Sequence, residues 1–245
     1  DRQERSHVFA CPVDEVVATE AGQVRAALAA VERAVEQGLH AAGFICYEAA
    51  TGLDRALQTA APGELPLVYF GLFATRESLT AWEETGDYVL GAWQPSVDQA
   101  AYEADIERIR DHIAAGDTYQ VNYTLRLRSD FSGDPRGLYR NMCRAQQAAY
   151  CAYIDIGRHV LLSASPELFF RIQDKHCTTR PMKGTRPRGR WPAEDRKLAK
   201  ELRQSAQDRA ENIMITDLLR NDLGRISQVG SVEVARLWET ERYPT

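Results

Sequence analysis

Residues 150–172 read YCAYIDIGRHVLLSASPELFFRI, and this stretch decides the fold class. Three apolar runs, at residues 150–156, 160–164 and 168–172, follow one another with only short connections between them. Short apolar runs bounded by turn residues such as Gly, Pro and Ser are typical of β-strands. Because strands come in consecutive runs here and helical patterns are grouped beside them, we predict an α+β protein with sheets flanked by helices, and not a regular βαβ alternation.

Apolar side chains recur at helical spacing on both sides of this stretch. Between residues 20 and 37 they run from Val24 to Val35, and Gly38 follows as a C-cap. Ser96 opens a capping-box pattern before a second helix that ends at Gly116. The remaining predicted elements are helices at 135–145, 192–205 and 210–223, and strands at 43–47, 67–73, 119–128 and 231–239.

The composition is that of a globular chain, with 245 residues and 44% hydrophobic content at the upper end of single-domain size. The formal net charge of -5 gives no reason to expect nucleic acid or an anionic membrane surface as the main partner. No apolar run approaches the roughly 20 residues that span a bilayer, and the N-terminus lacks the order of a secretory signal. We therefore expect a soluble protein that binds neither nucleic acid nor membrane.

Cysteine and histidine spacing excludes several chemistries. The five cysteines form no C-x-x-C pair, which indicates reduced thiols and a cytoplasmic location. The five histidines show no zinc spacing, and neither G-x-G-x-x-G nor a Walker loop is present, so zinc and nucleotide sites are not expected.

The chain starts at Asp1 without a methionine and stops at Thr245, directly after a predicted strand, and we expect a fragment of a longer protein.

The segment 180–187, RPMKGTRP, holds Lys183 between a proline and a glycine. A lysine fixed on such a bend and partly desolvated can lose its proton and act as a nucleophile. The N–H of Gly184 and the hydroxyl of Thr185 are suitable donors for a substrate carboxylate. Four neighbouring arginines, at positions 180, 186, 188 and 190, raise the local positive potential and favour an anionic substrate. The alternative is a solvated basic loop on which Lys183 is an ordinary surface residue.

Two carboxylates follow the lysine segment at the start of a predicted helix. Asp208 and Glu211 are three residues apart, so both lie on one helix face and can share a hard cation such as Mg²⁺. The alternative is that they only complement the helix dipole. A similar choice applies to Gln120, Asn122 and Thr124 on one face of the predicted strand 119–128, which either line a pocket or face solvent.

Five segments, in order along the chain, together resemble the chorismate-utilising enzymes. They are Gly116-Asp117-Thr118-Tyr119-Gln120-Val121-Asn122, Ser165-Pro166-Glu167-Leu168-Phe169, Pro181-Met182-Lys183-Gly184-Thr185, Asp208 through Gly224, and Gly230-Ser231-Val232-Glu233-Val234. Within this family, anthranilate synthases and the enzymes that make isochorismate or salicylate typically carry alanine at the position of Lys183. The aminodeoxychorismate synthase branch carries lysine there, and the triplet 120–122 points to the same branch.

The resemblance implies two large antiparallel sheets packed together, with helices outside, around a site for chorismate and Mg²⁺. By the same resemblance, Lys183 attacks chorismate, Gly184 and Thr185 contact the substrate, and Glu211 is a Mg²⁺ ligand with Asp208 a weaker candidate. Ammonia would come from a glutamine amidotransferase (glutaminase) subunit. We expect one chorismate-binding domain over 1–245, with an N-terminal subregion at about 1–95 and a C-terminally incomplete family core at about 96–245.

Two alternatives accompany this assignment. Anthranilate synthase component I, or another Mg²⁺-dependent chorismate enzyme, would share most of the segments but eliminate pyruvate or isomerise the substrate. A noncatalytic fragment that docks a glutaminase would need no complete site, and relatives carry further site residues after the Tyr-Pro-Thr segment at 243–245. On this ground we expect the isolated chain to be inactive.

Overall fold

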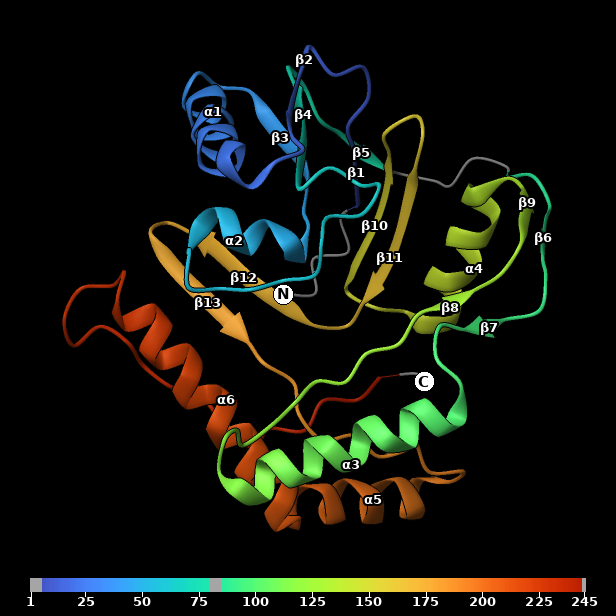
Figure 1. Cartoon of the computed structure of the whole chain (residues 1–245), viewed down its shortest axis with the longest axis vertical. Helices are drawn as coiled ribbons and strands as arrows, with labels where there is room; N and C mark the ends of the chain where they lie inside the picture. The colour runs from blue at the N-terminus through green and yellow to red at the C-terminus, as the bar shows by residue number, and fades with distance from the viewer. Residues whose placement is uncertain (1–5, 80–84, 244–245) are drawn as a thin grey trace. The chain divides into compact units, whose positions relative to one another are not determined.

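The computed structural model describes residues 6–79 and 85–243. Contacts within the chain divide it into two compact units, one formed by residues 1–84 and 143–245 and the other by residues 85–142. The predicted single domain, with its boundary near residue 95, stays a prediction. Each unit is described by itself below (Figure 1).

A three-stranded antiparallel sheet begins the first unit. Its strand order is β2 (Asp14–Ala18), β4 (Val68–Phe73), β3 (His40–Ile45), and helix α1 (Val24–Glu36) packs against all three strands (Figure 1). The predicted helix and the predicted strand 67–73 are confirmed, whereas the strand predicted at 43–47 lies at His40–Ile45, because Tyr47 belongs to the 3₁₀ turn that follows. The apolar run 67–73 occupies the centre of the sheet because it can bury side chains on both faces. Leu67, Val68 and Val24 are fully buried there.

Short elements surround this sheet. Strand β1 (Ser6–Val8) pairs with β5 (Glu77–Leu79), and the 3₁₀ turn η1 (Ala21–Gln23) leads into α1. A second 3₁₀ turn, η2 (Tyr47–Ala49), leads into the one-turn helix α2 (Ala50–Leu53). Gly43 fits only because it lacks a side chain, since a Cβ there would lie 1.9 Å from the carbonyl oxygen of Tyr69.

Two antiparallel hairpins form the middle of the chain. Strand β10 (Tyr150–Asp155) pairs with β11 (Val160–Ser165), and β12 (Leu168–Gln173) pairs with β13 (His176–Arg180). The first three were predicted from the stretch that opens the sequence analysis. Strand β13 was not predicted because HCTTR has little apolar content, and its partner β12 makes it a strand.

Two helices follow, and here two sequence predictions are corrected. Helix α5 (Pro192–Gln204) agrees with its prediction, whereas α6 (Ala206–Gly224) begins four residues before the predicted start. The reason is a cap, since the Ser205 hydroxyl accepts a hydrogen bond from the Asp208 N–H at 3.3 Å. The predicted strand 231–239 is wrong, because that segment pairs with no strand in the described part of the chain.

The second unit contains two short strand pairs, the whole of one helix and most of another. Strand β6 (Tyr88–Leu90) pairs with β9 (Phe131–Gly133), and β7 (Gln94–Pro95) pairs with β8 (Leu127–Arg128). Helix α3 (Gln99–Ala115) ends at Gly116 as predicted, and α4 (Pro135–Gln146) matches its prediction. Asp98, and not Ser96, caps α3, because its carboxylate accepts the Ala101 N–H at 2.8 Å.

The alternating stretch 119–128 is a strand only at Leu127–Arg128. Residues 119–126 lack a partner strand in the described ranges, so alternation alone does not make a ladder there. The stretch is held instead by side chains, since the Tyr123 hydroxyl donates to Asp105 at 2.7 Å and its ring meets Tyr102 edge to face.

The α+β class and the antiparallel pairing are both confirmed. Among the described residues, the strands form one three-stranded sheet and five two-stranded pairs. Across residues 6–79 and 85–243, no helix is long and apolar enough to cross a membrane.

Candidate functional site

A pocket of about 330 Å³ lies within the first unit, around the lysine segment. Its wall includes Arg180, the last residue of β13, and residues 181–186 and Arg188, which follow that strand. Four other parts of the chain complete the wall. They are Gln146 and Tyr150, the turn 166–168 before β12, Leu202, Arg203, Asp208, Arg209 and Asn212 from α5 and α6, and residues 238–241 with Tyr243.

Lys183 lies half-buried in this wall, next to Gly184 and Thr185. Gly184 has a φ of +78°, a left-handed conformation that a side chain would strain. No described carboxylate forms an ion pair with Lys183, although its arginine neighbours have partners. Three of the five predicted site residues, Lys183, Gly184 and Thr185, therefore lie together on one loop of the pocket wall.

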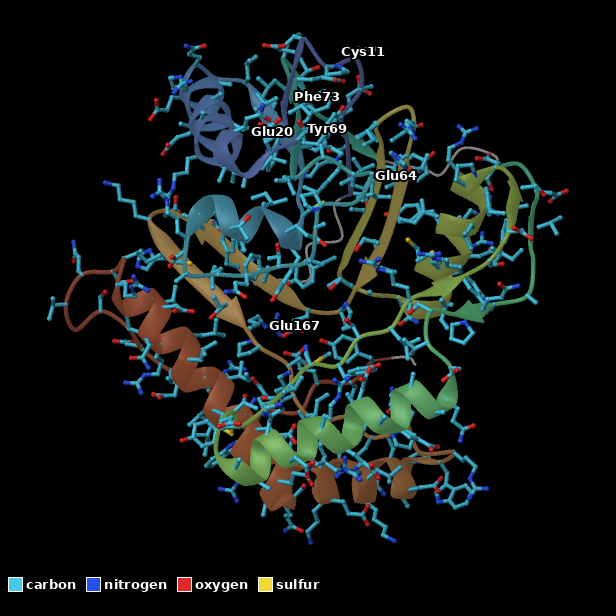
Figure 2. All side chains as sticks on the ribbon, in the orientation of Figure 1. Cys11, Glu20, Glu64, Tyr69, Phe73 and Glu167 are labelled. Carbon is cyan, nitrogen blue, oxygen red and sulfur yellow. The ribbon has the colours of Figure 1, made fainter. Side chains whose placement is uncertain are left out.

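The loop residue before the lysine is held by Glu167, which belongs to one of the five family-like segments but was not predicted as a site residue. The N–H of Met182 donates to Glu167 Oε1 at 2.9 Å. Glu167 directly precedes β12 and is labelled in Figure 2. The sequence signal for Glu167 was its place in the segment 165–169, because a single carboxylate has no distinctive spacing.

The residues after the lysine are tied to helix α6. Arg186 donates from Nη2 to Asp208 Oδ2 at 2.8 Å and from Nη1 to the Thr185 carbonyl at 2.8 Å. The Asp208 side chain is 16% exposed, and it lies so close to Gly184 that a Cβ there would be 2.8 Å from Oδ1. The guanidinium therefore joins the loop to the first turn of α6.

Further along the loop, Arg188 and Asp195 form a two-bonded ion pair at the start of α5. The Arg188 Nε and Nη2 atoms donate to the two carboxylate oxygens at 2.7 and 3.2 Å, and the Gly189 N–H donates at 3.1 Å. The Arg188 hydrogen bond, with the Gly189 N–H second, lowers the pKa of Asp195 to about 2. Arg188 also donates to the Tyr243 carbonyl at 2.8 Å, which fixes the C-terminal segment to the loop.

The C-terminal segment supplies the other side of the pocket. Arg180 pairs with Glu241, and the Tyr243 hydroxyl donates to the same carboxylate at 2.6 Å. Burial, and then this hydrogen bond, raises the pKa of Tyr243 to about 12. Arg209 lies 3.9 Å from the ring centroid of Trp238, a cation–π contact that sequence reasoning did not anticipate.

The two predicted metal ligands differ in their surroundings. Asp208 lines the pocket and is paired with Arg186, whereas Glu211 lies outside the lining set and accepts a hydrogen bond from Gln207 at 3.1 Å. Among the described residues, no three His, Cys, Asp or Glu side chains gather as a metal site. The pair can therefore supply at most part of a coordination sphere, and the metal assignment stays a prediction.

The class of protein to which this fold and site belong is that of the chorismate binding enzymes. Residues 82–245 match the family of chorismate binding enzymes, and the chain belongs to this family. The match starts at residue 82, before the predicted start of the family core at about residue 96.

Two kinds of relative are about equally similar. The chain is 39% identical over 153 residues to aminodeoxychorismate synthase component 1 of Salmonella typhimurium, a match that covers 62% of this chain and 34% of that protein. It is 40% identical over 159 residues to anthranilate synthase component 1 of Streptomyces coelicolor, covering 64% of this chain and 31% of that protein. The matched region thus spans about a third of each relative's length.

A solved structure shares the fold. The anthranilate synthase component I from Streptococcus pneumoniae TIGR4 superposes with a TM-score of 0.80 at 22% identity, covering 99% of this chain and 66% of that chain. Because 99% of this chain is covered, the likeness includes the N-terminal sheet.

Proposed function

We propose that the protein is component I of an aminodeoxychorismate synthase, which converts chorismate and ammonia to 4-amino-4-deoxychorismate for p-aminobenzoate and folate synthesis. The observation that carries the proposal is Lys183. It lies half-buried in the pocket wall, without a carboxylate partner among the described residues, at the position where the amination branch carries lysine.

The lysine amine is suited to the first chemical step. Its lone pair forms a C–N bond at C2 of chorismate while the bond from C4 to the hydroxyl breaks, and the hydroxyl leaves as water once protonated. Ammonia then forms a bond at C4 and the lysine leaves from C2, so the enzyme is regenerated without loss of pyruvate. The arginine-rich wall of the pocket suits a substrate that carries two carboxylates.

The N–H of Gly184 and the hydroxyl of Thr185 are the donors that we propose for a substrate carboxylate. Both residues line the pocket, and Thr185 is exposed on its surface. The left-handed φ of Gly184 disfavours a side chain there, and the Asp208 carboxylate fills the space that a Cβ would take.

Mg²⁺ would be held by Glu211, and a bound ion supplies positive charge for the ring carboxylate of chorismate. Mg²⁺ in proteins commonly takes one or two carboxylates, with waters and substrate oxygens completing the sphere, and a partial set of donors fits that requirement. No cationic side chain within the described ranges pairs with Glu211, whereas Asp208 is bound to Arg186. Glu211 is therefore the better ligand of the two.

A glutaminase subunit is the partner that we propose as the ammonia source, in keeping with the name component 1 carried by the relatives. All five cysteines are free thiols, which suits a cytoplasmic enzyme.

Product analysis tests the proposal. The full-length protein is incubated with chorismate, Mg²⁺ and ammonium, and the products are identified by mass spectrometry. We expect 4-amino-4-deoxychorismate, a covalent adduct on Lys183 by peptide mapping, and a loss of rate on the order of 10³-fold or more with no adduct in Lys183→Ala. An adduct of undiminished yield in that variant contradicts the role of the lysine.

Anthranilate synthase is the second candidate, and the identity of 40% to the Streptomyces coelicolor enzyme favours it. If anthranilate is the sole product and pyruvate is released, the protein is an anthranilate synthase.

A noncatalytic glutaminase-docking fragment is the third candidate, because the matched region spans about a third of the relatives. Calorimetric titration with chorismate and Mg²⁺ gives no heat for a docking module and measurable heat for an enzyme.

A further inference from the structure

Residues 238–243, most of which line the pocket, form an irregular segment that pairs with no strand in the described ranges. Four arginine side chains hold this segment, and they come from α6, α5, the end of β13 and the loop after it. The contacts are Arg209 with the Trp238 ring, Arg203 Nε with the Thr240 hydroxyl at 3.0 Å, Arg180 with Glu241, and Arg188 Nη1 with the Tyr243 carbonyl at 2.8 Å.

Two of these arginines lie at the ends of the loop that carries Lys183. Arg180 is the last residue of β13, and Arg188 follows the lysine after four intervening residues. Both bind the same short stretch, because Arg180 pairs with Glu241 and Arg188 donates to the Tyr243 carbonyl. Residues 241–243 therefore hold both ends of the loop 180–188 and restrict the distance between them.

Glu241 and Tyr243 are also bound to each other. The Tyr243 hydroxyl donates to Glu241 Oε2 at 2.6 Å, while Arg180 binds the other carboxylate oxygen, Oε1. Burial, and then this hydrogen bond, raises the pKa of Tyr243 to about 12, so the phenol remains a donor at neutral pH. A carboxylate with a partner on each oxygen is restrained in its orientation, and it holds Arg180 in turn.

The contacts at the ends of the loop are exposed to water. The side chains of Arg180 and Glu241 are each 43% exposed, and that of Arg188 is 42% exposed. Exposed ion pairs contribute little to the stability of a whole protein, because water and salt screen them. Their expected effect is therefore local, on the position of the two ends of the loop.

We propose that Glu241 and Tyr243 are positioning residues for Lys183, which act through Arg180 and Arg188 at the two ends of the lysine loop. With both ends held, the backbone that carries the lysine has a fixed course, and a nucleophile placed in this way loses little orientational freedom when it attacks. The effect on turnover rests on the proposed function, whereas the effect on the loop backbone does not.

Hydrogen exchange of the full-length protein without substrate tests the anchoring. Glu241→Gln and Tyr243→Phe are compared with Arg236→Gln, a control from the same part of the chain, since Arg236 pairs with Glu239 at 2.8 Å and lies outside the pocket wall. We expect exchange in residues 180–188 to become about five- to tenfold faster in the two test variants and to stay unchanged in the control. Exchange in β4 should stay unchanged in all three.

Two results of this exchange experiment overturn the proposal, whatever reaction the enzyme catalyses. One is unchanged exchange of residues 180–188 in both test variants. The other is an equal acceleration in β4, because the contacts would then stabilise the whole unit and not the loop.

Steady-state kinetics of the full-length protein test the link to the lysine. We expect Glu241→Gln to lower kcat about ten- to a hundredfold and Tyr243→Phe about three- to tenfold, both with little change in KM, because a displaced nucleophile loses reactivity more than substrate affinity. Glu241→Asp keeps the charge and should restore part of kcat. Full kcat in both Glu241→Gln and Tyr243→Phe, or a loss confined to KM, overturns the proposal.

A double variant checks that Glu241 acts through Arg180. Because the two side chains make one connection, Arg180→Gln combined with Glu241→Gln should lower kcat no further than the more damaging single change. Additive losses would show that Glu241 acts by another route and overturn the proposal.

The result for the loop and the result for the reaction are separable. If no adduct forms on Lys183 in the unsubstituted protein while residues 180–188 respond as expected, the proposed function fails and the anchoring stands. If the adduct forms but loop exchange is unchanged in both variants, the proposed function stands and the positioning role is wrong.

Discussion

The N-terminal sheet and the site region, residues 143–243, are held together in different ways. Of the ten buried apolar residues in the described ranges, nine belong to the sheet, its helix and the adjoining turns; they are Ala18, Val24, Ala27, Ala34, Ala49, Leu67, Val68, Leu72 and Phe73. Among the described residues of 143–243, none is buried to that degree. The site region depends instead on the carboxylate and arginine contacts described above.

The difference teaches how each region responds to change. Apolar burial contributes roughly 25 cal/mol per Å² and is insensitive to pH, whereas exposed ion pairs contribute only about 0–1 kcal/mol each and depend on pH and salt. A region fixed by polar contacts can place charged groups with precision. Its geometry, however, depends on the ionisation state of a few carboxylates.

The largest expected effect on stability is in the N-terminal sheet, the region that is held by apolar burial. Leu67 is 1% exposed, so Leu67→Ala should lower the free energy of unfolding by about 2–5 kcal/mol through lost burial and a cavity. Ile172, in β12 of the site region, is 66% exposed, and Ile172→Ala should stay within about 0.5 kcal/mol. Urea unfolding of both variants measures the difference, and equal losses would contradict the contrast between the regions.

A smaller, pH-dependent effect is expected at Asp195. Its pKa is lowered from 3.8 to about 2, so the stabilisation is fully present above pH 3.8 and is lost as the pH falls through about 2. Asp195→Asn should therefore lower Tm at neutral pH, and the gap to the unsubstituted protein should close between pH 4 and pH 2. Scanning calorimetry across that range is the measurement, with Glu194→Gln as a neighbouring control; a constant gap would rule out the linkage.

The smallest expected effect is at the sheet surface, where Tyr69 donates from its hydroxyl to Glu15 at 2.9 Å. Burial, followed by this hydrogen bond, raises the pKa of Tyr69 from 10.0 to about 12 (Figure 2 labels the residue). The raised pKa of the folded state adds stability below pH 10 that is lost as the pH rises through 12. Tyr69→Phe should cost about 1 kcal/mol or less at neutral pH.

Ultraviolet titration checks the Tyr69 prediction directly. In Glu15→Gln the pKa of Tyr69 should move back toward 10.0, because the negative charge and the charged acceptor are both removed. An unshifted titration would show that burial alone raises the pKa.

Sequence patterns predicted the longer helices and the strands that consist of apolar runs. The run 67–73 became the central strand of its sheet, and Gly38 and Gly116 ended their helices with φ of +93° and +82°. The alternating stretch 119–128 and the stretch 231–239 were assigned as strands, and both lack most or all of the pairing. Alternation of apolar and polar residues indicates which side chains would share a face of a strand. A strand, however, also needs hydrogen bonds to a second strand, and the local sequence does not encode that partner.

The sequence by itself determined the α+β class, the family, and the presence of Lys183, Gly184 and Thr185 on one turn, because these follow from local patterns and neighbouring residues. Only the tertiary structure decided which groups surround that turn. Glu167 and Asp208 come from segments 16 and 25 residues away along the chain from Lys183, and their contacts depend on how the turn before β12 and the first turn of α6 approach the loop. The relative position of these segments is set by packing between parts of the chain that are distant in sequence. No local sequence pattern predicts that position.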